Sequence, residues 1–315
     1  MREKAHYLVT GGAGFVGSNL VAELLERGQK VTVFDNFATG KRENLAPFLS
    51  SITLYEGDVR NFHQVREVVE GADHILHQAA LPSVPRSVQD PITSNQVNTD
   101  GTLNFLVAAR DARVKRFVFA SSSSVYGDSP TLPKVEDMPV NPLSPYAVSK
   151  LSAEKYCQAF ARLYELETVV LRYFNIFGPR QDPTSQYSAV IPRFITALKR
   201  GEAPIIYGDG QQSRDFTFVS NVVEANLLAC KASGLAGEVF NVACGDRFSL
   251  LDLLKHLQDI MGVSVPPKFE AARPGDVRHS LAGIEKISAA MGYRMGDDFR
   301  QGLERTVHYF LESKP

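Results

Sequence analysis

The sequence has few cysteines, and they are widely separated. Only Cys157, Cys230 and Cys244 occur among the 315 residues, and no two of them form a C-x-x-C pair. Zinc sites and disulfide frameworks use cysteines at short or regular spacings. The sequence therefore predicts neither a metal site nor a disulfide-bonded scaffold.

The sequence also lacks an excess of charge of one sign and any long apolar run. Its formal net charge is −1, which indicates no nucleic-acid-binding or membrane surface. No apolar run of 18 residues is present, and no apolar leader precedes the first strand-like segment. We therefore expect a cytoplasmic protein without nucleic-acid or membrane partners. Hydrophobic residues make up 44% of the chain, enough for a sizeable core.

What the sequence does contain is a glycine-rich segment between a strand-like run and a helix-like run. Residues 5–10 favour a strand, and residues 18–28 have the pattern of an amphipathic helix. Residues 10–17 between them read TGGAGFVG, which fits both G-x-G-x-x-G and G-x-x-G-x-x-G. Glycines in such a turn let a pyrophosphate approach closely, and the phosphate lies at the helix N-terminus. The segment therefore predicts a dinucleotide cofactor.

An aspartate after the second strand-like run, residues 30–34, indicates which dinucleotide is bound. Asp35 stands eighteen residues after Gly17, where a carboxylate accepts hydrogen bonds from the adenosine ribose and repels a 2′-phosphate. Lys41 and Arg42 follow and oppose this preference only slightly. Asp35 therefore predicts NAD rather than NADP.

Strand-like and helix-like runs alternate regularly as far as residue 174. This alternation predicts an α/β fold, a doubly wound parallel Rossmann sheet with a smaller α/β substrate-binding lobe. We expect residues 1–175 to form the NAD-binding domain, rejoined by about residues 215–246, and residues 176–315 to form the lobe. Expected strands lie at 52–55, 72–77, 116–120, 168–173, 205–207 and 239–242, and expected helices at 61–70, 94–112, 145–164, 189–200, 219–232, 249–261, 283–291 and 298–312.

A tyrosine and a lysine stand four residues apart in the expected helix 145–164. That spacing places Tyr146 and Lys150 on one face, one turn apart. A phenol with an ordinary pKa near 10 needs a shift of about 3 units, roughly 4 kcal/mol, to act as a base at neutral pH. A neighbouring ammonium favours the phenolate. The pair therefore suggests acid/base chemistry on a hydroxyl group.

The same helix carries an apolar stripe. Ala153, Cys157, Phe160 and Tyr164 follow one another at spacings of four, three and four. The stripe suits packing on the sheet, and it equally suits a helix–helix dimer seam.

Four serines, residues 121–124, follow the expected strand 116–120. A hydroxyl at the end of a central strand, near the tyrosine and lysine, can hydrogen-bond a substrate oxygen and relay a proton. Serine clusters are also common in turns, so the pattern alone does not decide between the two.

Together these features resemble the extended short-chain dehydrogenase/reductases, and among them the NAD-dependent epimerase/dehydratase family of nucleotide-sugar enzymes. The similarity covers essentially the whole chain and is strongest to UDP-N-acetylglucosamine and UDP-glucose 4-epimerases. Further matching segments are GDV at 57–59, VYG at 125–127, LRYFNIFGP at 171–179, GDGQQSRDF at 208–216 and RPGDVRHS at 273–280.

The resemblance implies roles for the reactive side chains. Tyr146 is the acid/base, and Lys150 lowers the pKa of its phenol and holds the nicotinamide ribose. Ser122 hydrogen-bonds the reacting oxygen, because it stands three residues before the Val-Tyr-Gly segment. Which of Ser122, Ser123 and Ser124 dominates the proton relay stays open.

The resemblance also implies two sets of binding residues and no metal ligand. Those expected to bind NAD are Gly11, Gly14, Phe15, Val16, Gly17, Asp35, Asn36, Gly40, Asp58, Val59, Gln78, Ala79, Ala80, Asn98, Ser122, Tyr146, Lys150, Tyr173 and Phe174. Those expected to bind a UDP-sugar are Ser83, Arg86, Ser122, Tyr146, Asn175, Val190, Tyr207, Arg214, Arg273, Asp276 and Ser280. Arginine suits a diphosphate because its guanidinium forms paired hydrogen bonds.

Two departures from related enzymes narrow the expected reaction. Dehydratases of the family carry an Asp-Glu pair where this chain has Ser123 and Ser124, so elimination of water is not expected. What remains is transient oxidation at C4 with tightly bound NAD. Ser280 stands where epimerases restricted to UDP-glucose and UDP-galactose place a tyrosine, which leaves room for a 2-acetamido group. We therefore expect a 4-epimerase of UDP-GlcNAc/UDP-GalNAc, of UDP-glucose/UDP-galactose, or of both.

Other interpretations remain open. A 4-keto-sugar reductase would need an exchangeable cofactor. A UDP-glucuronate epimerase or decarboxylase would need a cation for the C6 carboxylate, for which Arg86 is a candidate. A non-catalytic NAD-binding sensor usually lacks the tyrosine or the lysine, and both are present here. The family and the apolar stripe favour a homodimer.

Overall fold

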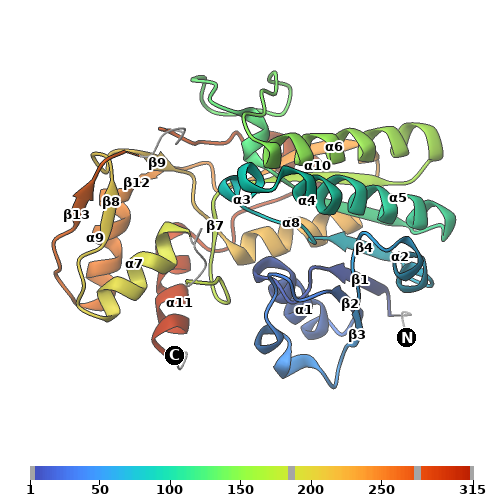
Figure 1. Ribbon diagram of the computed structural model, residues 1–315, viewed down its shortest axis with the longest axis horizontal. Coiled ribbons are helices and arrows are strands. Elements are labelled where there is room, and N and C mark those ends of the chain that lie inside the picture. Colours follow the sequence, from blue (N-terminus) through green and yellow to red (C-terminus); the bar gives the residue numbers. More distant parts are fainter. Residues whose placement is uncertain (1–3, 184–188, 273–277, 313–315) are drawn as a thin grey trace.

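A seven-stranded sheet forms the centre of the protein in a computed structural model, which describes residues 4–183, 189–272 and 278–312 (Figure 1). Each strand pairs in parallel with its neighbours. In spatial order the strands are β11 (Glu238–Val242), β6 (Thr168–Tyr173), β5 (Arg116–Ser122), β4 (His74–His77), β1 (His6–Thr10), β2 (Lys30–Asp35) and β3 (Thr53–Glu56). The predicted doubly wound parallel α/β sheet is confirmed.

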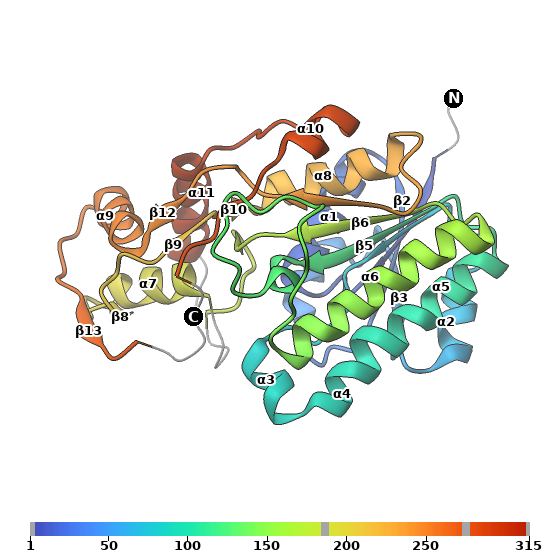
Figure 2. The same cartoon turned by 90° about the horizontal axis from the view of Figure 1, so that it is seen from above.

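Helices cover both faces of this sheet, because successive side chains of a strand point to opposite sides. In β1, Leu8 packs into one core cluster, whereas Tyr7 and Val9 pack into the other. Figure 2 shows the two helical layers on either side of the sheet. The Leu8 side holds α2 (Phe62–Val69), α5 (Gly101–Asp111) and α6 (Pro145–Tyr164), and the other side holds α1 (Phe15–Glu26) and α8 (Val219–Lys231).

The chain leaves the sheet after β6 and returns through α8 and β11. The excursion contains β7 (Ile176–Phe177), α7 (Val190–Lys199), β8 (Ile205–Tyr207), β9 (Ser213–Arg214) and β10 (Thr217–Phe218). After β11 come β12 (Phe248–Ser249), α9 (Leu250–Met261), β13 (Lys268–Glu270), α10 (Glu285–Met291) and α11 (Phe299–Glu312). The helices α7, α9 and α11 gather beside the sheet around their own core cluster (Figure 1).

The expected elements are present, with differences around the segment after β4. The expected helix 94–112 is divided into α4 (Pro91–Asn95), a π-helical turn at Gln96–Asp100, and α5. The helix α3 (Val84–Gln89) was not expected; its Pro85 stands in the first helical turn, where proline is tolerated. Single 3₁₀ turns lie at Arg42–Asn44, Ala46–Phe48 and Ser123–Tyr126. In the described part of the chain, no helix has the length and apolar character needed to cross a membrane.

The apolar stripe of α6 packs on the sheet. Ala153 and Cys157 are fully buried and Phe160 is 6% exposed, and all three belong to the core cluster on the Leu8 side. Tyr164 at the end of the helix is 47% exposed. Side chains that are covered within one subunit cannot contact a second subunit. The interpretation of this stripe as a dimer seam is therefore wrong.

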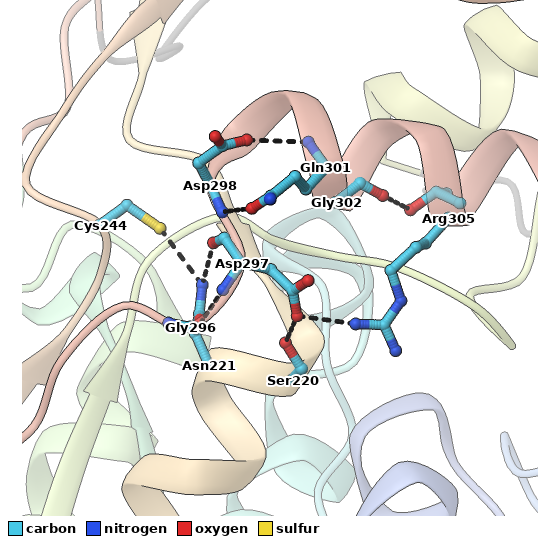
Figure 3. Close-up of polar contacts among 10 residues, drawn as sticks. Ser220, Asn221, Cys244, Gly296, Asp297, Asp298, Gln301, Gly302 and Arg305 are labelled. Carbon is cyan, nitrogen blue, oxygen red and sulfur yellow. Dashed lines mark hydrogen bonds and ion pairs between the residues drawn. The ribbon is translucent and has the colours of Figure 1, made fainter.

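A cluster of polar contacts fastens α11 to α8 (Figure 3). The side-chain amide of Asn221 donates to the carbonyl oxygen of Asp297 at 2.8 Å, and its oxygen accepts the backbone N–H of Gly296 at 2.9 Å. The Asp297 carboxylate accepts hydrogen bonds from Ser220 and, at 2.7 Å, from Arg305. These contacts join the C-terminal helix to the element that leads back into the sheet.

Candidate active site

A cavity of about 860 Å³ lies at the carboxyl ends of the strands, where open α/β sheets bind their ligands. The glycine turn after β1, the end of β2, the segment after β4, the end of β5 and the start of α6 form its walls. The expected NAD-binding residues that line it are Gly11, Gly14, Phe15, Val16, Gly17, Asp35, Asn36, Gly40, Val59, Gln78, Ala79, Ala80, Ser122, Tyr146, Lys150 and Tyr173.

The glycine turn is shaped by contacts that leave no room for side chains. Gly11 has φ +65°, and a Cβ there would lie 2.8 Å from the backbone nitrogen of Ala79. A Cβ on Gly17 would lie 2.1 Å from the carbonyl oxygen of Gly11. Gly14 caps α1 without a side chain, and no acidic residue stands in the first turn. The helix N-terminus is therefore open to an anion, as a pyrophosphate requires.

Asp35 fastens this turn to β2. Its carboxylate accepts the backbone N–H of Ala13 at 2.9 Å and that of Phe37 at 2.8 Å. Burial raises the pKa of Asp35, and these N–H groups act in the opposite direction. Because a carboxylate has about four lone-pair sites, it keeps acceptor capacity for a ribose hydroxyl. The turn and Asp35 together fit an adenine dinucleotide.

Three expected NAD-binding residues do not line the cavity. Asp58 pairs with Arg60 at 2.6 Å, and this hydrogen-bonded ion pair lowers the pKa of Asp58 to about 2. Asn98 is buried, and its side-chain oxygen accepts the backbone N–H of Leu81 at 2.8 Å, so it supports the cavity wall from behind. Phe174 lies in a separate core cluster.

Asn226 of α8 is a buried residue that sequence reasoning missed. Its side chain hydrogen-bonds Tyr173 at 2.8 Å and accepts a hydrogen bond from Gln78 at 3.1 Å. Tyr173 and Gln78 both line the cavity. An asparagine inside a helix carries no sequence signal for such a role, because its partners stand on distant strands.

The helix α6 delivers Tyr146 and Lys150 to the same cavity. Ser144 caps the helix by accepting the backbone N–H of Ala147, and Pro145 occupies the first turn. Lys150 is 3% exposed, and its ammonium donates to the carbonyl oxygen of Ala120 at 2.8 Å. Burial lowers the pKa of Lys150 to about 8.

The phenol of Tyr146 hydrogen-bonds Ser122 across the cavity. Burial raises the pKa of Tyr146, and the hydrogen bond with Ser122 opposes that rise. The lowering of this pKa by Lys150 stays a prediction, since the ammonium here is directed to Ala120.

The four serines at residues 121–124, at the end of β5 and directly after it, have different surroundings. Ser122 lines the cavity and accepts the backbone N–H of Ser124 at 3.2 Å. Ser121 donates to the buried carboxylate of Glu154. The hydroxyl of Ser124 is buried and has no hydrogen-bond partner among the described residues, and neither Ser123 nor Ser124 lines the cavity. Among these serines, Ser122 is therefore the one that hydrogen-bonds the phenol of Tyr146.

A second cavity of about 240 Å³ adjoins the first at Asn175, Ile176 and Ala189. Of the residues expected to bind a UDP-sugar, Asn175, Val190, Tyr207 and Arg214 line this second cavity, and Ser83, Arg86, Ser122, Tyr146 and Asn175 line the large one. Arg273 and Asp276 lie outside the described residues. Ser280 lines neither cavity but lies beside Asn175, at 3.5 Å between its hydroxyl and the side-chain nitrogen of Asn175.

Asp215 is a second buried residue that sequence reasoning missed. Its carboxylate accepts the backbone N–H groups of Cys244, Gly245 and Ala282 at 3.0 to 3.2 Å. Burial raises the pKa of Asp215 to about 6. Asp215 thus joins the segment after β11 to the segment that follows Ser280. The adjacent Arg214 was the only sequence signal for this position.

The fold matches that of known nucleotide-sugar enzymes. The model of the NAD dependent epimerase/dehydratase family matches residues 7–243. The chain belongs to this family. Membership confirms NAD as the cofactor, in agreement with Asp35. Across the described residues, no group of three or more His, Cys, Asp or Glu side chains could hold a metal ion.

Several members of the family are similar over nearly their full length. A UDP-N-acetylglucosamine 4-epimerase from Methanobrevibacter ruminantium M1, solved with UDP-N-acetylmuramic acid, is 40% identical with a TM-score of 0.94, over 98% of this chain and 99% of that one. The UDP-glucose 4-epimerase of Mycolicibacterium smegmatis is 37% identical over 96% of this chain and 97% of its own. The UDP-glucuronic acid 4-epimerase of Bacillus cereus, solved with UDP-glucuronic acid and NAD, is 30% identical with a TM-score of 0.90, over 98% and 99%.

Proposed function

We propose that this protein is a UDP-sugar 4-epimerase that interconverts UDP-GlcNAc and UDP-GalNAc, UDP-glucose and UDP-galactose, or both. One observation carries the proposal: Tyr146, Lys150 and Ser122 meet in the cavity that Asp35 and the glycine turn also line. A sugar hydroxyl in that cavity lies within reach of an acid/base and of the dinucleotide site at once.

In this mechanism the glycine turn and Asp35 hold NAD, which supplies a hydride acceptor and donor when bound. The Tyr146 phenolate takes the proton of the C4 hydroxyl and later returns it from the phenol. Ser122 hydrogen-bonds the reacting oxygen and the phenol. Lys150 places a buried positive charge one helical turn from Tyr146, which favours the phenolate. The sugar turns over between the two proton transfers, and the hydride removed from C4 would return to its opposite face, so there is no net redox change.

The neighbouring serines support epimerisation over elimination. Loss of water from the sugar needs a further acid/base pair beside the reacting oxygen. Ser123 and Ser124 occupy those positions in this chain, and neither has an acidic side chain or lines the cavity. The side chains present therefore suit proton transfer at one oxygen.

Ser280 supports acceptance of N-acetylated sugars. It is small and lies beside Asn175, the residue at which the two cavities meet. A small side chain there leaves space for a 2-acetamido group without excluding the smaller hydroxyl of UDP-glucose.

A UDP-glucuronate 4-epimerase is the second candidate. Arg86 lines the large cavity and supplies a cation for a C6 carboxylate. The similarity to the Bacillus cereus enzyme supports this alternative.

We further propose that residues 1–175 together with about 215–246 form the NAD-binding domain and residues 176–315 the remaining lobe, and that the protein acts in the cytoplasm as a homodimer. Exposed apolar side chains on α3, α4 and α6, namely Val88, Ile92 and Val148, supply a surface for the second copy. Native mass measurement tests this assembly.

The decisive experiment incubates the purified protein with UDP-glucose, UDP-GlcNAc and UDP-glucuronate separately, without added NAD, and resolves the products. Epimers formed from either of the first two would support the proposal and tight retention of NAD. Turnover of UDP-glucuronate alone would favour the second candidate. No product from any of the three, even with NAD supplied, would refute an epimerase.

A further inference from the structure

A buried ion pair lies beneath the active site and has no role in the reaction as described so far. Glu154 of α6 is fully buried, and Arg172 of β6 is 3% exposed. The Arg172 guanidinium donates to both carboxylate oxygens of Glu154, from Nε at 3.0 Å and from Nη2 at 2.8 Å. Replacing such a pair by apolar side chains is often neutral or stabilising. Stability alone is therefore a weak reason for burying two charges here.

The Glu154 carboxylate also contacts the strand end that carries Ser122. The hydroxyl of Ser121 donates to the same oxygen that Arg172 Nε contacts. The carbonyl oxygen of the preceding residue, Ala120, accepts a hydrogen bond from the Lys150 ammonium. Two side chains of α6 thus hold two successive residues of β5, directly before Ser122. Movement of either contact would move the Ser122 hydroxyl relative to the Tyr146 phenol.

Tyr146, Lys150 and Glu154 form one row along α6 at spacings of four residues, so each lies one turn from the next. Lys150 consequently has a reactive phenol one turn before it and a carboxylate one turn after it. The other titratable groups that pack around Lys150 are His77 of β4, Cys157 of α6 and Arg172 of β6. Tyr173 of β6 shares its cavity, which is also lined by the charged side chains of Asp35, Lys41, Arg60, Arg86, Arg180 and Asp182.

His77, Cys157 and Tyr173 carry no charge at neutral pH. Burial lowers the pKa of His77 to about 3, so its ring is neutral. Burial raises the pKa of Cys157 and of Tyr173 far above neutrality. Glu154 is thus the carboxylate facing Lys150 within the described residues, and its charge acts against the effect of burial on the pKa of Lys150.

We propose that Glu154 is a positioning residue for the proposed reaction, which fixes the strand end bearing Ser122 against α6 and supplies the buried negative charge that keeps Lys150 an ammonium. This inference rests on the proposed function. Arg172 supports this role of Glu154. Its two hydrogen bonds hold the Glu154 carboxylate in one orientation and offset the cost of burying it.

The test compares two substitutions that separate charge from position. Glu154→Gln keeps the shape and removes the charge. We expect the alkaline limb of the kcat–pH profile to move to lower pH by about one unit. Loss of a neighbouring opposite charge lowers the pKa of a lysine such as Lys150 by about one unit or more. Glu154→Asp keeps the charge and shortens the side chain. We expect that limb to stay in place while kcat falls at every pH, because Ser121 loses its partner.

A direct titration of Lys150 makes the test independent of turnover. NMR of protein labelled with ¹⁵N-lysine, with the signal assigned through Lys150→Met, reports the Lys150 pKa in wild type and in Glu154→Gln. A lower pKa in the variant supports the proposal. An unchanged pKa together with an unmoved alkaline limb overturns it, even if the variant melts at a lower temperature, because that pattern describes a merely structural pair.

A control variant and a double variant test whether the effect is specific to Glu154. Arg27→Gln breaks an exposed ion pair with Glu23 on α1 and should leave the alkaline limb unchanged. If Glu154→Gln does not fold, the double variant Glu154→Gln/Arg172→Gln removes the anion with its partner, and a smaller fall of the Lys150 pKa is expected, because loss of the Arg172 cation acts in the opposite direction. Absence of turnover in the wild type on every sugar would refute the proposed function, whereas the Lys150 titration would still decide the charge effect.

Discussion

The side-chain nitrogen of Asn175 lies 3.5 Å from the hydroxyl of Ser280, although 105 positions separate the two residues. The same amide donates to the carbonyl oxygen of Asp215 at 3.1 Å. Asn175 is the second residue after the end of β6. Its φ is +29°, a value that its short polar side chain tolerates. It therefore joins the sheet to the segments that form the second cavity.

Substitution of Ser280 by tyrosine should change which sugars are accepted. A phenol beside Asn175 would fill the space that a 2-acetamido group needs, while a 2-hydroxyl would still fit. We expect Ser280→Tyr to reduce kcat/KM for UDP-GlcNAc by at least about tenfold, roughly 1.4 kcal/mol, and to affect UDP-glucose much less. Ser280→Ala is the size-matched control and should keep both activities. Equal losses on both sugars in Ser280→Tyr would remove Ser280 from the sugar pocket.

Loss of the Tyr146 hydroxyl should abolish epimerisation and leave the fold intact. The phenol lies in the first turn of α6, where Phe can occupy the same space. We expect Tyr146→Phe to lower kcat by about 10² to 10⁴, the range for removal of a general acid/base. Bound NAD, measured by extraction, should not change. Tyr156→Phe, on the exposed side of the same helix, serves as control. Near-normal turnover by Tyr146→Phe would contradict the mechanism.

Ser122 at the end of β5 and Ser123 after it should differ in importance, because only Ser122 hydrogen-bonds the Tyr146 phenol. Ser122→Ala removes the hydrogen bond to Tyr146 and the group that would contact the substrate oxygen. We expect its kcat to fall by about 10² or more, the contribution of a well-placed proton-transfer partner. Ser123→Ala should change kcat little, since Ser123 does not line the cavity. A larger effect of Ser123→Ala would assign the relay to that neighbour.

The glycine turn should not tolerate a methyl group at Gly17. A Cβ there would lie 2.1 Å from a backbone oxygen, which cannot move away as the tip of a side chain can. We expect Gly17→Ala to destabilise the protein by about 3 kcal/mol and to release NAD, as judged by thermal melting and cofactor content. Gly28→Ala provides the comparison, because Gly28 has φ +70° but no atom within 4 Å of an added Cβ. Its cost should be about 1 kcal/mol, without loss of NAD.

Asp215 should make stability rise as the pH falls from 7 to 5. Its folded-state pKa is raised to about 6, above the unfolded value, so the folded protein takes up a proton first. The stability it contributes is complete below about pH 4 and is lost as the pH rises through 6. We expect wild type to gain about 1 kcal/mol relative to Asp215→Asn between pH 7 and pH 5, measured by urea unfolding. Parallel stability curves for the two proteins would show that this carboxylate is not buried as described.

Much of the architecture was predictable because local sequence patterns determine it. The strands and helices of the sheet follow period-2 and period-3.6 spacings, and the glycine turn follows from residues adjacent in sequence. The sequence left two interpretations of the apolar stripe on α6 open, packing on the sheet and a dimer seam, and packing on the sheet is confirmed. An apolar stripe records that a face is buried but not what buries it, and in this protein the sheet covers Cys157 and Phe160.

The sequence by itself determined the cofactor and the placement of the proposed acid/base pair on one helix face. Asp35 follows the glycine turn at a fixed distance, and Tyr146 and Lys150 are one helical turn apart, so short-range geometry places them. Only the tertiary structure decided which residues support them. Asn226 with Tyr173 and Asp215 with Ala282 are pairs that meet because the chain leaves the sheet after β6 and returns as β11. Glu154 meets Arg172 because α6 packs on β6, the strand that follows it. Contacts of that kind depend on packing between distant segments, and no spacing along the chain encodes them.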